Sequence, residues 1–144
     1  MRIWIIDSDW LVTRTLQEFL TELGHEVESL PGEQRLADLL EKESEPVDLV
    51  IMDLCTEDAL EKTRLRRIHE RFPSLRVIAV PKHNSVLPTE EALAHGIHAF
   101  LHRPVQLAEL ELMLVRLAEN HGRNSRDGQP GNGRNTVSKD SARL

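Results

Sequence analysis

The run of residues 47–53, VDLVIMD, constrains the fold more than any other stretch of the chain. Five of its seven residues are apolar, and it ends on a carboxylate, Asp53. Short apolar runs rich in β-branched residues are typical of strands buried on both faces, as in a parallel sheet. The N-terminus repeats the pattern, because apolar residues 3–6 lead into Asp7-Ser8-Asp9. Open α/β sheets bind ligands at the carboxyl edge of their strands, so these acids predict one acidic pocket there.

Strand-like and helix-like segments alternate along the chain. We expect strands at 2–6, 25–30, 47–53, 76–80 and 97–102, and helices at 9–23, 33–43, 58–71, 90–95 and 105–119. Short connections and right-handed crossovers then favour an α/β fold with three layers. The prediction is a doubly wound, flavodoxin-like, five-stranded parallel sheet with strand order 2-1-3-4-5.

The chain divides by composition at about residue 120. Beyond it the chain is mostly Gly, Asn, Ser, Arg and Asp with little to bury, so we predict one domain over 1–120 and a disordered polar tail over 121–144. The net charge of −6 argues against direct binding of nucleic acid. The single cysteine cannot form an internal disulfide, which suits the reducing cytoplasm. No apolar run approaches the roughly 18 residues of a membrane span, so we expect a cytoplasmic protein.

Three carboxylates are the candidates for chemistry. Asp7 and Asp9 follow the first predicted strand, and Asp53 ends the third. Clustered carboxylates are costly unless a positive charge lies between them, and Mg²⁺, which prefers oxygen ligands, supplies one. We therefore predict Asp7, Asp9 and Asp53 as metal ligands. The alternative is that Asp9 only caps the following helix and Asp7 is only a turn residue.

Arg103 before Pro104 lies at the end of the fifth predicted strand, on the same edge of the sheet. A cation there neutralises the acids or binds a phosphoryl oxygen. An Arg-Pro peptide bond also has access to the cis form, which would fix the direction of the side chain. The alternative is an ordinary surface arginine before a turn.

The order of elements and the placing of these residues resemble the receiver domain of bacterial response regulators over residues 1 to about 120. The resemblance rests on an acid after the first strand, Asp53 after the third and a basic-Pro pair after the fifth. It implies a non-enzymatic signalling module of a two-component phosphorelay in which Asp53 is the phosphoacceptor. It also implies Mg²⁺ as cofactor and a histidine kinase or phosphotransfer protein as partner. A carboxylate is a fair nucleophile towards phosphorus once cations screen the incoming charge.

The chain departs from the family's pattern at four positions. Ser8 replaces the second of two adjacent acids, so the metal site is expected to be weakened unless Asp9 compensates. Pro81 stands where the family has a Thr or Ser that binds the phosphoryl group, and it has neither a hydroxyl nor an amide hydrogen. Arg103 replaces a lysine with a planar fork, and Glu57 replaces a proline. We therefore expect atypical or lost switching, or, as the alternative, a phosphorylation-independent pseudo-receiver that binds proteins.

The last predicted helix carries apolar residues on two sides. Val105, Leu112 and Val115 lie opposite the stripe expected to dock on the sheet. In receiver-like proteins this region commonly forms a dimer or partner face, so we predict an interface there for a homodimer or a partner protein. The alternative is scattered surface apolar residues, which are common.

Two enzyme or cofactor functions fit less well. The stretch 7–11, DSDWL, is similar to the start of haloacid-dehalogenase-type phosphatases, but the family's later Ser or Thr and acid pair have no clear counterparts. A flavin-binding flavodoxin-like protein needs a Ser/Thr/Gly-rich phosphate loop after the first strand, where this chain has acids.

Overall fold

The first of two compact units is a five-stranded, all-parallel sheet. The computed structural model describes residues 1–30, 36–83 and 87–127, and the two units are Met1–Leu110 and Glu111–Leu144. The strands are β1 (Arg2–Ile6), β2 (Glu26–Leu30), β3 (Leu49–Leu54), β4 (Arg76–Pro81) and β5 (Ile97–Phe100). Their order is β2-β1-β3-β4-β5, and every neighbouring pair is parallel. The predicted fold class and strand order are confirmed.

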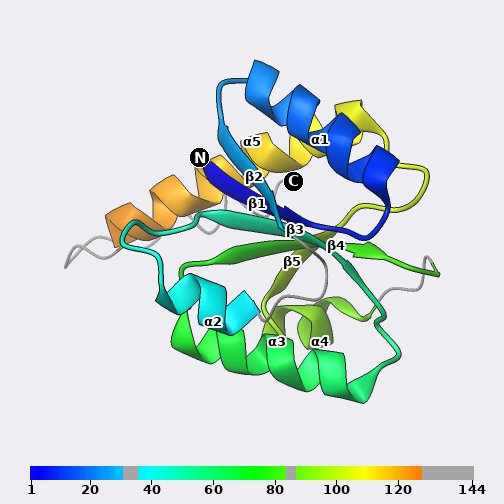
Figure 1. The fold of residues 1–144 in the computed structure, drawn as a ribbon. Coiled ribbons are helices and arrows are strands. Elements are labelled where there is room, and N and C mark those ends of the chain that lie inside the picture. Colours follow the sequence, from blue (N-terminus) through cyan, green and yellow to red (C-terminus); the bar gives the residue numbers. More distant parts are fainter. Residues whose placement is uncertain (31–35, 84–86, 128–144) are drawn as a thin grey trace. The chain divides into compact units, whose positions relative to one another are not determined.

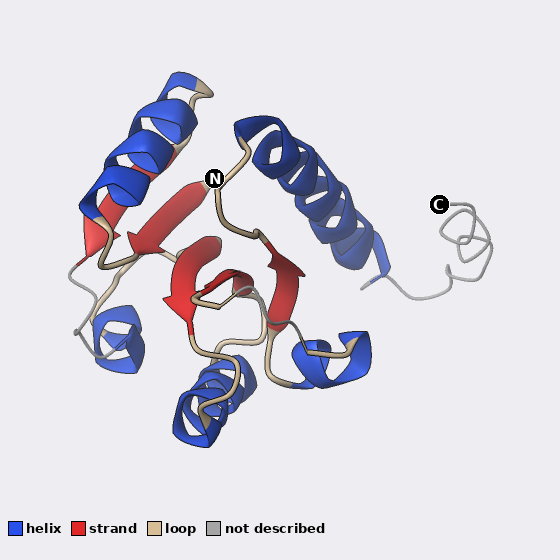
Figure 2. Ribbon diagram, turned by 90° about the vertical axis from the view of Figure 1, so that its right-hand side faces the viewer, coloured by secondary structure: helices blue, strands red, loops and turns tan. Residues whose placement is uncertain are grey.

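Helices cover both faces of this sheet. They are α1 (Trp10–Glu22), α2 (Leu36–Glu41), α3 (Ala59–Arg71) and α4 (Thr89–Ala94). A fifth helix, α5 (Leu107–Asp127), lies mostly in the second unit. Helix α1 lies on one face, and α2, α3 and α4 lie on the other (Figure 1). The strands form the layer between them (Figure 2). Residues 33–35 of the second predicted helix lie outside the described residues.

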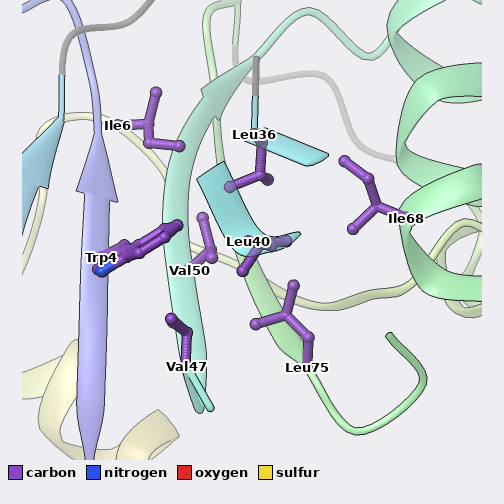
Figure 3. Packing of buried hydrophobic residues seen from close by; sticks show 8 residues of the cluster. All are labelled: Trp4, Ile6, Leu36, Leu40, Val47, Val50, Ile68 and Leu75. Atoms are coloured by element: carbon purple, nitrogen blue, oxygen red, sulfur yellow. The ribbon is translucent and has the colours of Figure 1, made fainter. Parts of the chain in front are cut away.

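Burial follows the position of each strand in the sheet. The inner strands β1, β3 and β4 are almost wholly buried, whereas the edge strand β2 is mostly exposed. Side chains from β1 and β3 point towards those of α2 and α3 in one apolar cluster (Figure 3). Its buried members are Trp4, Ile6, Leu36, Leu40, Val47, Val50, Ile68 and Leu75. The run of residues 47–53 therefore contributes several side chains to the core, as expected for a strand buried on both faces.

Helix α5 is longer than its sequence predicts. It continues to Asp127, past the predicted helix end at residue 119, while the division into a domain over 1–120 and a disordered tail stays a prediction. Polar composition suggested disorder there, but the chain has no proline between Pro104 and Pro130 to end a helix. The rest of the predicted tail, 128–144, lies outside the described residues. Over the part of the chain that is described, no helix has the length and apolar character needed to cross a membrane.

The partly buried position of His98 on β5 is expected to make the stability of the domain depend on pH. Burial, and then the positive charge of Arg76, lower the pKa of His98 from its ordinary 6.5 to about 4, and nearby His69 acts in the same direction. The imidazole Nδ1 accepts from the Val77 amide at 3.4 Å. A group with a lowered pKa contributes stability that is complete above pH 6.5 and is lost as the pH falls towards 4.

We expect wild type to lose about 1–2 kcal/mol of unfolding free energy through His98 over this window, after a discount for partial solvent screening. His98→Gln retains an acceptor but does not titrate, so its stability should fall less steeply between pH 6.5 and 4. Urea denaturation at several pH values measures both slopes. Parallel curves for the two proteins would contradict the assignment.

Candidate functional site

Asp7 and Asp53 meet at the carboxyl edge of the sheet. Ile6 of β1 pairs with Met52 of β3. The residues that follow them, Asp7 and Asp53, therefore lie at the same level along the two neighbouring strands. Adjacent strands lie only about 4.8 Å apart, which brings the two carboxylates into one site. The negative charge of Asp53 acts on the titration of Asp7, as expected for such neighbours. The two acids that the sequence placed at one edge are thus brought together.

The Asp7 side chain is buried, with 2 % of its surface exposed. Its Oδ1 accepts from the Asp9 amide at 2.8 Å, and its Oδ2 pairs with Nη2 of Arg103 at 3.2 Å. Burial raises the pKa of the Asp7 carboxyl above its ordinary value, and the charge of Asp53 raises it further, while the Asp9 amide and Arg103 oppose the shift. Asp7 is therefore an acid whose two oxygens both have partners within the protein.

Asp9 caps the following helix, which was the alternative to its predicted role as a metal ligand. Its Oδ1 accepts from the amides of Leu11 at 3.0 Å and Val12 at 3.4 Å, which caps helix α1. Among the described residues, no group of three or more His, Cys, Asp or Glu side chains is placed to hold a metal ion. The predicted metal set of Asp7, Asp9 and Asp53 is therefore not assembled. The reason is that the first turn of α1 leaves amides without partners, and the Asp9 carboxylate satisfies two of them.

Asp53 is the half-buried member of the pair. The hydroxyl of Ser8 donates to its Oδ2 at a long 3.4 Å. Ser8 is the residue that replaces an acid of the resembled family, so a neutral donor stands where a second carboxylate would be. Asp53 is consequently more accessible to a ligand than Asp7, whose side chain is almost inaccessible.

Arg103 crosses the edge of the sheet from β5 towards β1. Its Nε donates to the Pro81 carbonyl oxygen at 3.3 Å, and its Nη2 bonds Asp7. The Arg103-Pro104 bond is cis, the form considered in the sequence analysis. The prediction that Arg103 neutralises an acid is met at Asp7, while its binding of a phosphoryl oxygen stays a prediction.

Sequence reasoning missed two features near the site. The Glu61 carboxylate accepts from the Cys55 amide at 3.1 Å and so closes the loop after β3. The spacing of Asp58, which caps α3, and Glu61 is that of a capping box, so a signal was present. An open groove of about 770 Å³ also runs along α1 and includes Asp7 and Trp10 in its lining. The sequence pattern contains no signal that predicts this groove.

The predicted interface residues belong to different units of the chain. Leu112 and Val115 of α5, in the second unit, are each half exposed. Val105, in the first unit, is partly buried. The prediction of an interface through these residues is not tested by this arrangement and stays a prediction.

One protein family matches most of this chain. The family described as the response regulator receiver domain matches residues 3–115. The curated protein DNA-binding transcriptional regulator NtrC from Azospirillum brasilense is 27% identical over 114 residues, which cover 79% of this chain and 23% of that protein. The protein of the same name from Proteus hauseri is 26% identical, over 94% of this chain and 28% of its own length. The chain thus spans about a quarter of these relatives.

Solved structures agree with this assignment. The signal receiver domain of an HD domain-containing protein from Pseudomonas fluorescens Pf-5 has a TM-score of 0.66 and 27% identity, over 85% of this chain and 97% of that one. NtrX from Brucella abortus, solved in complex with ATP, has a TM-score of 0.69 and 21% identity, over 94% of this chain and 31% of that one. The second likeness shows the fold alone.

Proposed function

Because the chain belongs to the response regulator receiver domain family, which serves as the signalling module of two-component systems, we propose that Asp53 is its phosphoacceptor. The position of Asp53 carries the proposal, since it lies near the carboxyl end of the central strand β3, beside Asp7, and is half-buried. The phosphoryl donor in this proposal is a histidine kinase or a phosphotransfer protein. A cytoplasmic location goes with it, because receiver domains are typically soluble.

The proposed chemistry is a single displacement at phosphorus. A carboxylate oxygen of Asp53 attacks the phosphorus of a phosphohistidine, the O–P bond forms, and the P–N bond breaks. The electron pair of that bond stays on the leaving imidazole, which takes a proton from solvent. Arg103 at the same edge offers donors to the charged phosphoryl oxygens. Acetyl phosphate would react in the same way with acetate as the leaving group.

Switching after phosphorylation is the part of the family's mechanism that this chain supports least. Pro81 ends β4 and offers neither a hydroxyl nor an amide hydrogen to a phosphoryl group. Its carbonyl oxygen accepts from Arg103. We propose that phosphorylation of Asp53 is coupled to the rest of the domain in an atypical way or not at all.

A divalent metal does not fit the donor set as it stands. Receiver domains typically bind Mg²⁺ at the phosphorylation site, but here Asp9 is a helix cap and both oxygens of Asp7 have protein partners. We propose a weakened Mg²⁺ site at Asp7 and Asp53. This arrangement is also the observation that favours the second candidate, a pseudo-receiver that binds proteins without being phosphorylated.

Partner surfaces complete the proposal. Val105, Leu112 and Val115 remain our candidates for contact with a second copy or another protein. The relatives named above are DNA-binding regulators, and this chain matches only about a quarter of their length. The phosphatase and flavodoxin alternatives are not favoured, since the family assignment covers residues 3–115.

Incubation with acetyl phosphate tests the phosphoacceptor directly. With MgCl₂ present, the intact mass of the wild-type protein should rise by one phosphoryl group, and Asp53→Asn should show no rise because an amide is a poor nucleophile. Ser8→Ala is the matched control, since it removes the hydroxyl that contacts Asp53 but leaves the carboxylate. Unmodified wild type, under conditions that label another receiver domain, would favour the pseudo-receiver.

A further inference from the structure

We propose that the Arg103 guanidinium is an internal counter-cation for Asp7, so that it weakens the binding of a divalent metal ion at this site. The inference rests on the proposed site at Asp7 and Asp53. It explains the poor fit of a divalent metal ion to this site by the position of one side chain, Arg103. In this role Arg103 sets how strongly the site takes a divalent cation.

The contacts of Asp7 carry the first step. Its side chain is nearly inaccessible, and its Oδ2 bonds Nη2 of Arg103 while its Oδ1 bonds the Asp9 amide. Mg²⁺ needs oxygen ligands at short distances in near-octahedral geometry. A metal ion bound to Asp7 would therefore share a carboxylate oxygen with the Asp9 amide or with the positively charged Arg103.

The topology of the sheet carries the second step. Arg103 follows β5, yet it bonds the carbonyl oxygen of Pro81 at the end of β4 and the carboxylate of Asp7 after β1. Strand β3 lies between β4 and β1 in the sheet. A guanidinium held by both neighbours of β3 spans the carboxyl end of β3, where Asp53 lies. The positive charge is thus held at the edge of the sheet where both carboxylates lie.

The shape of the side chain explains why an arginine does this. The guanidinium has five donors in a rigid plane, so one group bonds Pro81 and Asp7 together, whereas the ammonium of the family's lysine is a compact point charge. Arg103 is only 25 % exposed, so water screens its charge incompletely. A divalent ion at the same edge would be repelled by this positive charge, and water would screen the repulsion only in part.

The remaining groups do not compensate. Ser8 contributes a hydroxyl that donates to Asp53, and Asp9 is committed to the cap of α1. Across residues 1–30, 36–83 and 87–127, no three acidic, His or Cys side chains converge as metal ligands. Removal of the Arg103 charge is therefore the single change that should free a carboxylate for the metal.

Titration of the unphosphorylated full chain with MgCl₂ tests this proposal. Trp10 lines the groove that contains Asp7, so its fluorescence reports the site, and water-proton relaxation with Mn²⁺ gives a readout that needs no tryptophan. We expect Arg103→Ala to bind Mg²⁺ at least about tenfold more tightly than wild type, which corresponds to about 1.4 kcal/mol. Arg103→Gln, which loses the charge but keeps a donor for Pro81, serves the same test should the alanine variant fold poorly.

Lys82→Ala is the matched control. Lys82 is an exposed cation next to Pro81, and its removal lowers the charge at the same edge without touching Asp7. It should change Mg²⁺ affinity less than threefold, as expected for an exposed charge in water. Equal or weaker Mg²⁺ binding by both Arg103 variants would overturn the proposal, as would an equal gain in Lys82→Ala. The titration involves no phosphoryl transfer, so failure of the Asp53 proposal would show in the mass experiment alone.

Discussion

Trp4→Ala is expected to lower the free energy of unfolding by about 3–5 kcal/mol, the usual cost of truncating a buried aromatic residue. Trp4 is the largest of the fully buried side chains, and it packs in the cluster between the sheet and helices α2 and α3 (Figure 3). Domains of this size are stable by only about 5–15 kcal/mol. The substitution should therefore leave a domain that unfolds at much lower urea concentration, followed by circular dichroism.

Trp4→Phe should behave differently because of the indole nitrogen. Within the described residues, Nε1 of Trp4 is buried without a hydrogen-bond partner. Phenylalanine loses part of the packing but also removes this orphan donor, which costs about 1–3 kcal/mol. We expect a net change below about 1 kcal/mol.

Trp10→Ala is the control of the same residue type, since Trp10 is 68% exposed. Its effect should be within about 0.5 kcal/mol of zero. A loss in Trp4→Phe as large as in Trp4→Ala would contradict the assignment of an unsatisfied indole.

Gly96→Ala is expected to destabilise the domain by about 2–3 kcal/mol, the sum of two costs. Gly96 has φ +82°, which L residues rarely adopt, and an added Cβ would lie 2.8 Å from Cβ of His69 on α3. The clash is with a Cβ atom, so rotation of the imidazole does not relieve it. The new methyl group must instead push α3 and the start of β5 apart.

Gly24→Ala separates the two costs. Gly24 follows α1 with φ +96°, and an added Cβ there would meet nothing within 4 Å. This variant should lose only about 1 kcal/mol, the cost of the backbone conformation. Urea denaturation of both variants gives the difference, and equal losses would show that the contact with His69 is not tight.

The fold could be predicted because the burial of each segment is reflected in its pattern of apolar and polar residues. Strands with both faces covered are apolar throughout, and Gly24 and Gly96 have positive φ and follow α1 and α4, where the sequence suggested helix ends. Once the strands were parallel, their carboxyl ends had to share one edge, which placed Asp7 near Asp53. These inferences need only local patterns and the rules of sheet topology.

The site could be predicted only in part, because the same residue suits two roles. Asp9 is a good metal ligand and a good helix cap, and the choice depends on amides that become unpaired only when α1 forms. The bond from Arg103 to Asp7 joins residues 96 positions apart, so no local pattern announces it. The extension of α5 to Asp127 was missed since composition describes burial and says little about where a surface helix stops.

Reductive trapping after phosphorylation tests the central claim most directly. The chain is incubated with acetyl phosphate, borohydride reduces any aspartyl phosphate to the alcohol, and tandem mass spectrometry then finds homoserine where the acceptor stood. We expect homoserine at position 53 and aspartate unchanged at Asp7 and Asp9. Homoserine at Asp7 or Asp9, or none at position 53 while a control receiver domain is labelled, would contradict it.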